Sequence, residues 1–328
     1  VFRGMDSRPP AGSGPSGQNV DPITASVVQL GLVAIVEAMG GAMLRTSYSQ
    51  ILHSSRDFST AICGEEGRLV AQAEHIPVHV GALPWAVRAL REFFEGDVHE
   101  GDVFRLRDPY FGVSHLPDLT AFVPVFAGGR LLFWTVNRAH HSDIGGATHG
   151  AYNASATEIW QEGLRVPPLR LYSRGELRED VQQMLWVNVR HPRDFQGDLA
   201  AQIGSVRLGE RRLLDLMAEF GADIVEAAVE TILDAAERQV RAVLATWKDG
   251  VYEGEAELDD DGRGNTDIAI RATVTVRGSE LEVDLSRSDA QVTSFVNSSH
   301  ANMQSAVAMR SLFFSTRRFR RTTARCAR

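Results

Sequence analysis

The first ordered segment that the pattern of apolar residues predicts is a helix running from residue 22 to about residue 48. Asp21 is suited to cap this helix, and Pro22 to occupy its first position. Its apolar residues recur at helical spacing, and they are Val27, Val28, Leu32, Ile35, Val36, Met39 and Met43. The stretch 27–44 contains Gln29 and Glu37 and is barely long enough to span a bilayer. We therefore predict a buried helix and no membrane segment.

Further helices are expected later in the chain. The segments 83–94, 176–189, 195–220 and 223–247 show helical periodicity. The last two are separated by Gly221 and predict a long helical hairpin. Its inward-facing residues are Leu199, Ile203, Val206, Leu213, Leu216 and Met217.

Other segments alternate with the period of two that strands require. Residues 58–63 and 69–73 predict two strands joined by the turn GEEGR, and residues 102–107 predict another. From residue 252 onward the period is again two, which predicts an antiparallel layer. The fold class expected is therefore α+β, with antiparallel sheet layers and the helical hairpin, in two unequal lobes.

The sequence also predicts a β-hairpin in the stretch 108–146. The apolar runs 119–127 and 131–136 flank Gly128-Gly129, a typical two-residue turn. If residues 127 and 130 close that turn in a regular register, His140 faces Pro117. His115 then lies two residues further along the same face, within joint reach of one ion.

Asp118 has the wrong parity for this regular register, but it follows Pro117, which commonly marks a strand start or a bulge. His115, Asp118 and His140 can therefore converge at the open end of the hairpin. Two imidazoles and a carboxylate with vacant positions are typical of a catalytic metal site. On spacing alone the alternative is a hydrogen-bonded polar group that closes the hairpin. The neighbouring His141 and Asp143 favour the metal, because a ligating histidine usually donates its second N–H to a carboxylate or carbonyl.

Two further histidines stand before the expected helix 83–94. His75 and His79 have the spacing of a helical metal pair, but Pro77 lies between them and argues against a regular helix there. The alternatives for His75 and His79 are contact with a substrate, contact with a metal ligand, or simple packing within a loop.

Composition limits the classes of function. The formal net charge is −8, but residues 315–328 carry six arginines; without them 28 basic residues face 42 acidic ones. This body does not resemble a nucleic-acid binder. There is no phosphate-binding loop and no G-x-G-x-x-G motif, so no nucleotide site of its own is expected. Cys63 and Cys326 form no disulfide framework, and a reducing cytoplasmic location fits best.

Four long motifs together give a resemblance to a known family. They are RDFSTAICGEEGRLVAQAEHIPVHVGALPWAVRAL, GDVFRLRDPYFGVSHLPDLT, NRAHHSDIGG and ATEIWQEGLRVPPLRLY. In this order they resemble the hydantoinase B/oxoprolinase family, over residues 21–297. The family includes B subunits of N-methylhydantoinases, part of 5-oxoprolinase and the large subunits of acetone carboxylases.

The resemblance implies an enzyme subunit that depends on a partner. An ATP-binding A-type subunit would phosphorylate the substrate, and this chain would complete the hydrolysis of a lactam such as 5-oxoproline or a hydantoin. By motif, the family's metal ligands fall on His115, Asp118 and His140, and zinc, manganese or iron would suit them. An ion with an open position could activate water.

Several residues near these motifs are candidates for supporting roles. His141, Asp143 and Glu158 are our candidates for orientation of the site or proton transfer, with hydrogen-bonded loop residues as the alternative. Glu158 also ends Ser-Ala-Thr-Glu at 155–158, which has the form of a capping box for a short helix. Arg56 and Asp57 contact substrate or tie the strand to its neighbour, and the structural role is slightly favoured.

The chain departs from the family in two places. Gly112-Val113-Ser114 stands where the family has Gly-Gly-Thr, and the family pattern ends after about residue 314 in an Arg/Thr-rich stretch. We expect a flexible leader at 1–20, a main domain at 21–250, an antiparallel β segment at 251–314 and an irregular basic tail at 315–328, in a truncated chain. The alternatives are a ketone carboxylase subunit and a catalytically silent interaction module.

Overall fold

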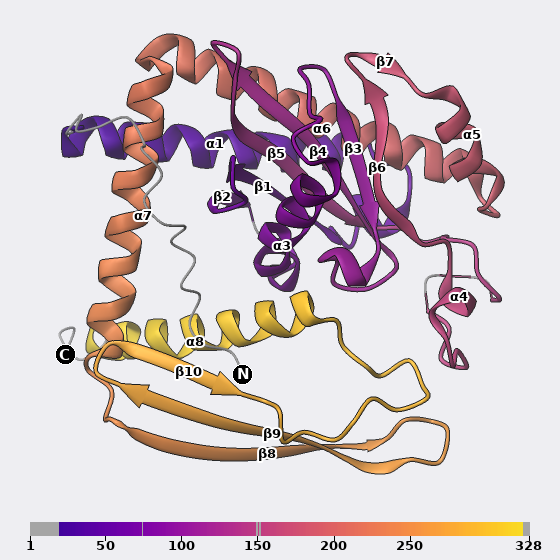
Figure 1. The fold of residues 1–328 in the computed structure, drawn as a ribbon, viewed down its shortest axis with the longest axis vertical. Coiled ribbons are helices and arrows are strands. Elements are labelled where there is room, and N and C mark those ends of the chain that lie inside the picture. Colours follow the sequence, from indigo (N-terminus) through magenta and orange to yellow (C-terminus); the bar gives the residue numbers. More distant parts are fainter. Residues whose placement is uncertain (1–19, 74, 149, 151, 324–328) are drawn as a thin grey trace.

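The computed structural model describes residues 20–323 except residues 74, 149 and 151 (Figure 1). The leader predicted for residues 1–20 therefore lies outside the described residues, apart from Val20, and so does Cys326. The described part contains a sheet of seven strands, a sheet of three strands and helices that cover or connect them. The predicted α+β class with antiparallel sheets is confirmed.

The larger sheet carries the predicted hairpin at its centre. Its strand order is β2-β1-β5-β4-β3-β6-β7, and all its pairs are antiparallel. The strands are β1 (Phe58–Gly64), β2 (Leu69–Ala73), β3 (Val103–Arg107), β4 (Asp118–Ala127), β5 (Arg130–His140), β6 (Val166–Ser173) and β7 (Glu176–Leu177). Gly128 and Gly129 form the turn between β4 and β5, and both have positive φ, as a primed hairpin turn requires.

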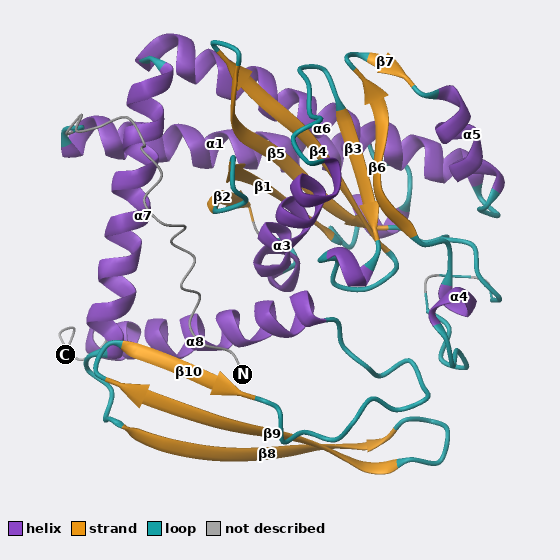
Figure 2. Cartoon of the chain, in the orientation of Figure 1, coloured by secondary structure: helices purple, strands orange, loops and turns teal. Residues whose placement is uncertain are grey.

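Helices cover both faces of this sheet (Figure 2). The helices of residues 22–244 are α1 (Pro22–Thr46), α2 (Gln50–His53), α3 (Pro77–Phe94), α4 (Ile159–Glu162), α5 (Glu179–Val187), α6 (Pro192–Phe220) and α7 (Ala222–Leu244), with a short 3-10 helix at Pro109–Phe111, and not all of them lie on the sheet. Helices α1 and α6 pack together on one face, through residues that include Leu32, Val36, Leu199 and Val206. Helix α3 packs on the other face against Trp134 and Phe122.

Helix α1 begins as predicted, because the Asp21 carboxylate accepts hydrogen bonds from the backbone N–H groups of Ile23 and Thr24. By length and composition α1 could also cross a membrane. Its residues Val28, Leu32, Val36 and Met39 are buried against α6 and the sheet, which is the packing of a core helix.

Helices α6 and α7 meet at Gly221 as predicted, but they do not lie side by side as a hairpin (Figure 1). After that turn α7 leaves the larger sheet and runs toward the smaller one (Figure 1). Of the six residues expected to face inward, all but Leu216 are buried, and Leu216 is partly buried against the same core. The pair therefore packs inward along α6, while α7 links the two sheets.

The smaller sheet consists of the predicted strands β8 (Gly250–Asp260), β9 (Thr266–Arg277) and β10 (Glu280–Asp284), in the order β10-β9-β8. The sequence prediction of a β segment to residue 314 and an irregular tail beyond it differs from the structure. Helix α8 occupies His300–Thr323, and its first turns pack against α3. The Ser305 hydroxyl donates to the Val78 carbonyl oxygen there, which joins the C-terminal helix to the larger sheet's covering layer.

Three local predictions were wrong for identifiable reasons. Helix α3 begins at Pro77 instead of residue 83, because proline is tolerated in a first turn where it breaks an interior one. Residues 176–177 form β7 and precede α5. The capping box is absent: the Ser155 hydroxyl donates to the Asn153 side chain, and Glu158 is the N-cap residue of α4 without a side-chain capping bond.

Cys63 offers a test of the packing between the larger sheet and α3. Burial raises the pKa of its thiol to about 12, so the thiol is protonated and unreactive between pH 7 and 9. We expect Cys63 to resist alkylation by iodoacetamide in the folded chain and to react at once in denaturant. Peptide mapping by mass spectrometry separates Cys63 from Cys326, and rapid labelling of Cys63 in the folded chain would contradict the packing described.

Candidate metal centre

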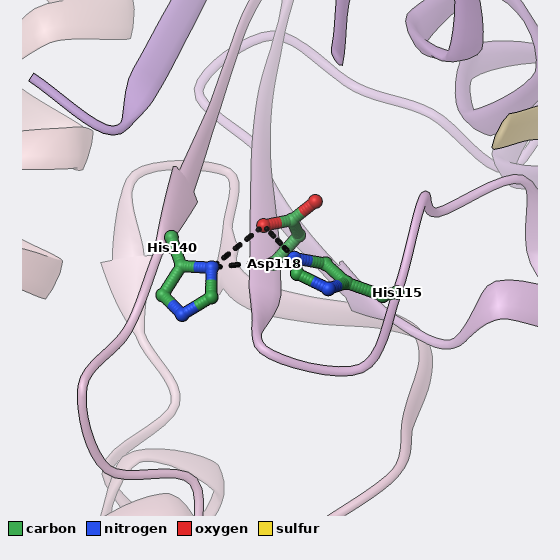
Figure 3. Close-up of side chains that lie close together, drawn as sticks. All are labelled: His115, Asp118 and His140. Carbon is green, nitrogen blue, oxygen red and sulfur yellow. Dashed lines mark hydrogen bonds and ion pairs between the residues drawn. The ribbon is translucent and has the colours of Figure 1, made fainter. Parts of the chain in front are cut away.

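The candidate site lies where the paired ends of β4 and β5 meet. Asp118, the first residue of β4, is directly opposite His140, the last residue of β5. His115 lies three residues before Asp118, in the loop that leads into β4 (Figure 3). The hairpin thus brings together the three residues that the sequence predicted as metal ligands.

The register that places them differs from the predicted one. A regular hairpin puts His140 opposite Pro117, whereas the structure puts it opposite Asp118. The cause is a bulge: Phe126 pairs with Leu131 and Val125 with Phe133, which leaves Leu132 as an extra residue in β5. This one-residue shift gives Asp118 the parity of His140, so both side chains lie on the α3 face of the sheet.

The three side chains approach one another closely. His115 Nε2 is 3.0 Å from Asp118 Oδ1 and 3.2 Å from His140 Nδ1. His140 Nδ1 is 3.6 Å from the same carboxylate oxygen. One ligand atom from each residue therefore faces a common point (Figure 3).

Two more residues extend this cluster. His79, in the first turn of α3, places Nε2 3.3 Å from Asp118 Oδ2 and 3.8 Å from Asp57 Oδ1. Asp57, just before β1, places Oδ2 3.7 Å from His140 Nδ1. Asp57 also serves the structure, because its carbonyl oxygen accepts the backbone N–H of His140. The structural role predicted for Asp57 therefore has a geometric basis, and contact with substrate stays a prediction.

The spacing and the bonding needs of these atoms fit a cation. Ligand atoms about 2.0–2.2 Å from one tetrahedral ion lie about 3.3–3.6 Å from each other, close to the 3.0–3.6 Å found among His115, Asp118 and His140. His115 Nε2 and His140 Nδ1 carry at most one proton each. Two protons cannot give a hydrogen bond to each of the three contacts among His115, His140 and Asp118. Asp118 Oδ2 faces His79 Nε2 at 3.3 Å, so Oδ1 is the carboxylate oxygen that remains for an ion. Two imidazole nitrogens and carboxylate oxygens suit zinc, manganese or iron.

Charge within the cluster favours an ionised Asp118. Burial alone would raise the pKa of this fully buried carboxyl group, but the charges of His79 and His115 outweigh burial and hold its pKa well below the usual value. Burial lowers the pKa of His115, and the charge and hydrogen bond of Asp118 outweigh that effect, so the pKa is raised. The site therefore combines a buried anion with imidazoles whose protons a divalent ion can replace.

One side of the site is open. The His115 side chain is 34% exposed, whereas Asp118 is fully buried and His140 is 2% exposed. Tyr152, itself exposed, has its ring centroid 5.7 Å from those of both His115 and His140. A small molecule would reach the cluster past His115 and Tyr152.

The loop before His115 depends on a glycine. Gly112 has a φ of +93°, and a Cβ there would lie 2.7 Å from the backbone N of Ala86 and the carbonyl carbon of Trp85 in α3. Backbone atoms cannot move away as a flexible side chain can, so the loop itself would shift.

We expect Gly112→Ala to destabilise the chain by about 1 kcal/mol from the left-handed backbone and by about 1–3 kcal/mol more from the contact with α3. Gly96→Ala is the matched control, because Gly96 has a φ of +87° and nothing within 4 Å of an added Cβ. Urea denaturation measures both variants. Equal losses would show that the approach of the loop to α3 is not close.

His141 is not part of this cluster. Its ring lies on the α6 face, 5.0 Å from the Phe195 ring, with Nε2 3.1 Å from Gln202 Oε1. Burial, followed by the nearby Arg107 cation, holds the His141 pKa well below its usual value. The side chain is thus a neutral buried group, and its proposed catalytic role stays a prediction.

Asp143 and Glu158 are also away from the three predicted ligands. The Asp143 carboxylate accepts the backbone N–H groups of Gly145, Arg190 and His191, which closes the loop after β5. Glu158 is exposed at the start of α4. Asp143 therefore makes the contacts of a hydrogen-bonded loop residue, which was the alternative considered for it. A role in proton transfer stays a prediction for Asp143 and for Glu158.

The prediction from sequence gave His79 too little weight and did not include Tyr152. Pro77 argued against a helix at His79, but Pro77 occupies the first turn of α3, where proline is tolerated. Its companion His75 packs on the Phe58 ring at 4.5 Å and close to Gly40 of α1, as the loop-packing alternative expected. Placing Pro77 at the first helical position could have identified His79 as a residue of the first turn.

Comparison with known proteins supports the predicted resemblance. The family model for hydantoinase B/oxoprolinase matches residues 21–317. The beta subunit of caprolactamase from Pseudomonas jessenii is 39% identical over 296 residues, which is 90% of this chain and 51% of that protein. The B subunit of a putative D-/L-hydantoinase from Pseudomonas sp. (strain NS671) is 34% identical over 285 residues, 84% of this chain and 48% of that protein.

Solved structures agree with this assignment. The crystal structure of ATP-dependent caprolactamase from Pseudomonas jessenii superposes with a TM-score of 0.85 and covers 89% of this chain and 50% of that one. The nucleotide-free acetone carboxylase structure has a TM-score of 0.78 at 18% identity, over 87% of this chain and 40% of that one, and shares the fold. This chain spans about half the length of these relatives. With the family's motifs, fold and match across residues 21–317, the chain belongs to the hydantoinase B/oxoprolinase family.

Proposed function

We propose that this chain is the B-type subunit of an ATP-dependent cyclic amide hydrolase with a divalent metal ion at His115, Asp118 and His140. The observation that carries the proposal is the convergence of these three side chains on one point at the open end of the hairpin. The hydrolase class is supported by relatives named caprolactamase, hydantoinase and 5-oxoprolinase.

The residues of the cluster divide into ligands and supports. His115 Nε2, His140 Nδ1 and Asp118 Oδ1 would hold the ion, and Asp57 Oδ2, 3.7 Å from His140 Nδ1, is placed to join them. A bound divalent ion would supply Lewis-acid polarisation of an amide carbonyl and water activation near neutral pH. His79 Nε2 faces the other oxygen of Asp118, so it would keep Oδ1 turned toward the ligand side.

Other residues near the cluster would orient the substrate and the ligands. Tyr152 stands at the opening beside both histidine rings, where a flat amide can stack on it. His141 and Asp143 hold the segment that follows His140 through Gln202 and the 190–191 backbone. These contacts would fix the His140 ring, and Glu158 remains a candidate for proton transfer.

We infer that ATP is used by a partner subunit. The sequence contains neither a phosphate-binding loop nor a G-x-G-x-x-G motif, and the relatives are named as beta and B subunits. An ATP-binding A-type subunit would phosphorylate the amide oxygen, which makes the carbonyl carbon more electrophilic before water attacks it. A cytoplasmic location suits a subunit that works with ATP.

The substrate class proposed is a small cyclic amide. 5-Oxoproline and hydantoins are the first candidates, and the relative named caprolactamase adds a larger lactam ring. Carboxylation of a ketone is the second candidate, but the likeness to acetone carboxylase extends to the fold alone.

The test is a coupled assay of the chain with a hydantoinase A-type subunit, ATP and each cyclic amide. Ring opening that requires both subunits and stops in chelator is the expected result. Consumption of bicarbonate with acetone, without lactam opening, would identify a carboxylase instead. A metal-loaded complex with no turnover of any of these substrates would favour the silent-module alternative.

A further inference from the structure

Arg138 lies two residues before His140 on β5 and is fully buried. Its guanidinium makes hydrogen bonds in several directions at once. Nε donates to Thr120 Oγ1 at 2.9 Å, Nη1 to Ser114 Oγ at 2.9 Å, and Nη2 to the Gly112 carbonyl oxygen at 3.1 Å. A longer contact of 3.5 Å joins Nη1 to the His79 carbonyl oxygen.

Each of these partners belongs to a segment that carries a residue of the metal cluster. Gly112 and Ser114 form the loop that ends in His115. Thr120 follows Asp118 by two residues on the same face of β4, and His79 contacts Asp118 from α3. Arg138 itself stands on the strand that ends in His140. One rigid planar group therefore joins all four segments.

We propose that Arg138 is a positioning residue, whose guanidinium sets the distance and orientation of the His115 loop relative to Asp118 and His140. This inference rests on the proposed metal centre, since it assigns Arg138 the task of preorganising that centre. It predicts that the loop is held even when no ion is bound, because the hydrogen bonds of Arg138 involve no ligand side chain.

The far side of the same loop is also held. The Ser299 hydroxyl lies 3.0 Å from the Val113 carbonyl oxygen and 2.8 Å from that of Ser114, just before α8 begins. The loop is thus fixed between β5 and the segment that leads into α8. Arg138 is the inner of these two supports and the one that reaches Asp118's strand.

A lysine cannot replace this arginine. An ammonium group is a single point with three donors, whereas the guanidinium fork reaches partners on separate segments in one plane. Arg138→Lys keeps the charge and removes the fork, and Arg138→Met removes both. Arg170→Lys is the matched control, because Arg170 is a largely buried arginine of the same sheet, on β6, and its guanidinium pairs with Asp97 and Asp102 instead of any segment of the metal cluster.

Two readouts separate positioning from general stability. The first is zinc affinity, measured by competition with a chromophoric chelator, together with the visible spectrum of the cobalt-substituted chain. We expect Arg138→Lys to weaken zinc binding about tenfold or more and to alter the cobalt spectrum, whereas Arg170→Lys leaves both unchanged. The second is amide hydrogen exchange over residues 112–118 without metal, which we expect to accelerate in Arg138→Lys alone.

The outcomes distinguish this inference from the proposed function. A parent chain that binds no zinc but shows faster exchange at 112–118 in Arg138→Lys overturns the metal centre and keeps the loop role. Zinc binding in the parent that Arg138→Lys leaves unchanged, with unchanged exchange, overturns the role of Arg138. Equal losses in Arg138→Lys and Arg170→Lys would also overturn it, as they would reflect a general loss of stability.

Discussion

Replacing Asp118 with asparagine is expected to abolish metal binding and to lower the activity of the complex with its partner by about 10³-fold or more, equivalent to about 4 kcal/mol. Asp118 is fully buried and has one carboxylate oxygen 3.0 Å from His115 Nε2 and the other 3.3 Å from His79 Nε2. Asparagine keeps the volume and removes the anion that attracts a cation into this site. Equilibrium dialysis with zinc or manganese and the coupled ring-opening assay measure the two effects.

Asp180→Asn is the control for this substitution. Asp180 is exposed at the start of α5 and is paired with Arg178, away from β4 and β5. The Asp180→Asn variant should bind metal and support turnover like the parent chain. Retained metal in a folded Asp118→Asn variant would show that the ion is held elsewhere.

The largest effect on stability is expected for Trp134→Ala, at about 3–5 kcal/mol. Trp134 is fully buried between β5 and α3, in a cluster with Phe104 and Val87, and its indole N–H donates to the Glu65 carbonyl oxygen at 3.2 Å. Alanine would leave a cavity under the strand that ends in His140, and an unpaired carbonyl oxygen. Urea denaturation with an unchanged slope would report this loss as a lower midpoint.

Trp160→Ala provides the comparison. Trp160 is 67% exposed on α4, and its described ring contact is with Arg165 at 5.7 Å. Its loss should cost no more than about 1 kcal/mol. Similar losses for both tryptophans would mean that Trp134 is not the core residue of the α3 layer.

The hairpin shows how far the sequence determines the site. Gly128-Gly129 and the apolar runs beside them predicted the turn and both strands, because these signals are local. The bulge at Leu132 could not be predicted, since Leu132 is apolar like its neighbours and is buried at 5% exposure. That single extra residue decides whether Asp118 or Pro117 faces His140. The three predicted ligands therefore lie together as expected, while the predicted register was wrong.

Contacts between distant segments were harder to predict. Asp57 and His79 reach Asp118 and His140 only because α3 and the start of β1 pack at the same end of the sheet. No spacing in the sequence encodes that meeting, and the family motifs pointed to the three hairpin residues alone. Pro77 was misleading, because its effect depends on whether it lies at the first or an interior position of the helix.

The C-terminal region differed from expectation for a similar reason. Strands β8, β9 and β10 follow a clear period of two, and their prediction was correct. The structure forms α8 from His300 onward, with its first turns against α3. The Ser299 hydroxyl accepts the backbone N–H of Asn302 as a helix cap does, and the prediction missed this local signal. The Ser299 and Ser305 contacts with the larger sheet's loop and helix belong to tertiary packing, which local patterns do not report.

The metal content of the purified chain tests the central claim most directly. Elemental analysis should be made on the parent and on a His115→Ala/His140→Ala double variant, each dialysed against zinc, manganese and iron. The account predicts about one ion per parent chain and almost none in the double variant, with both chains folded by circular dichroism. A parent that is folded yet binds none of these ions, or a double variant that keeps its ion, would contradict it.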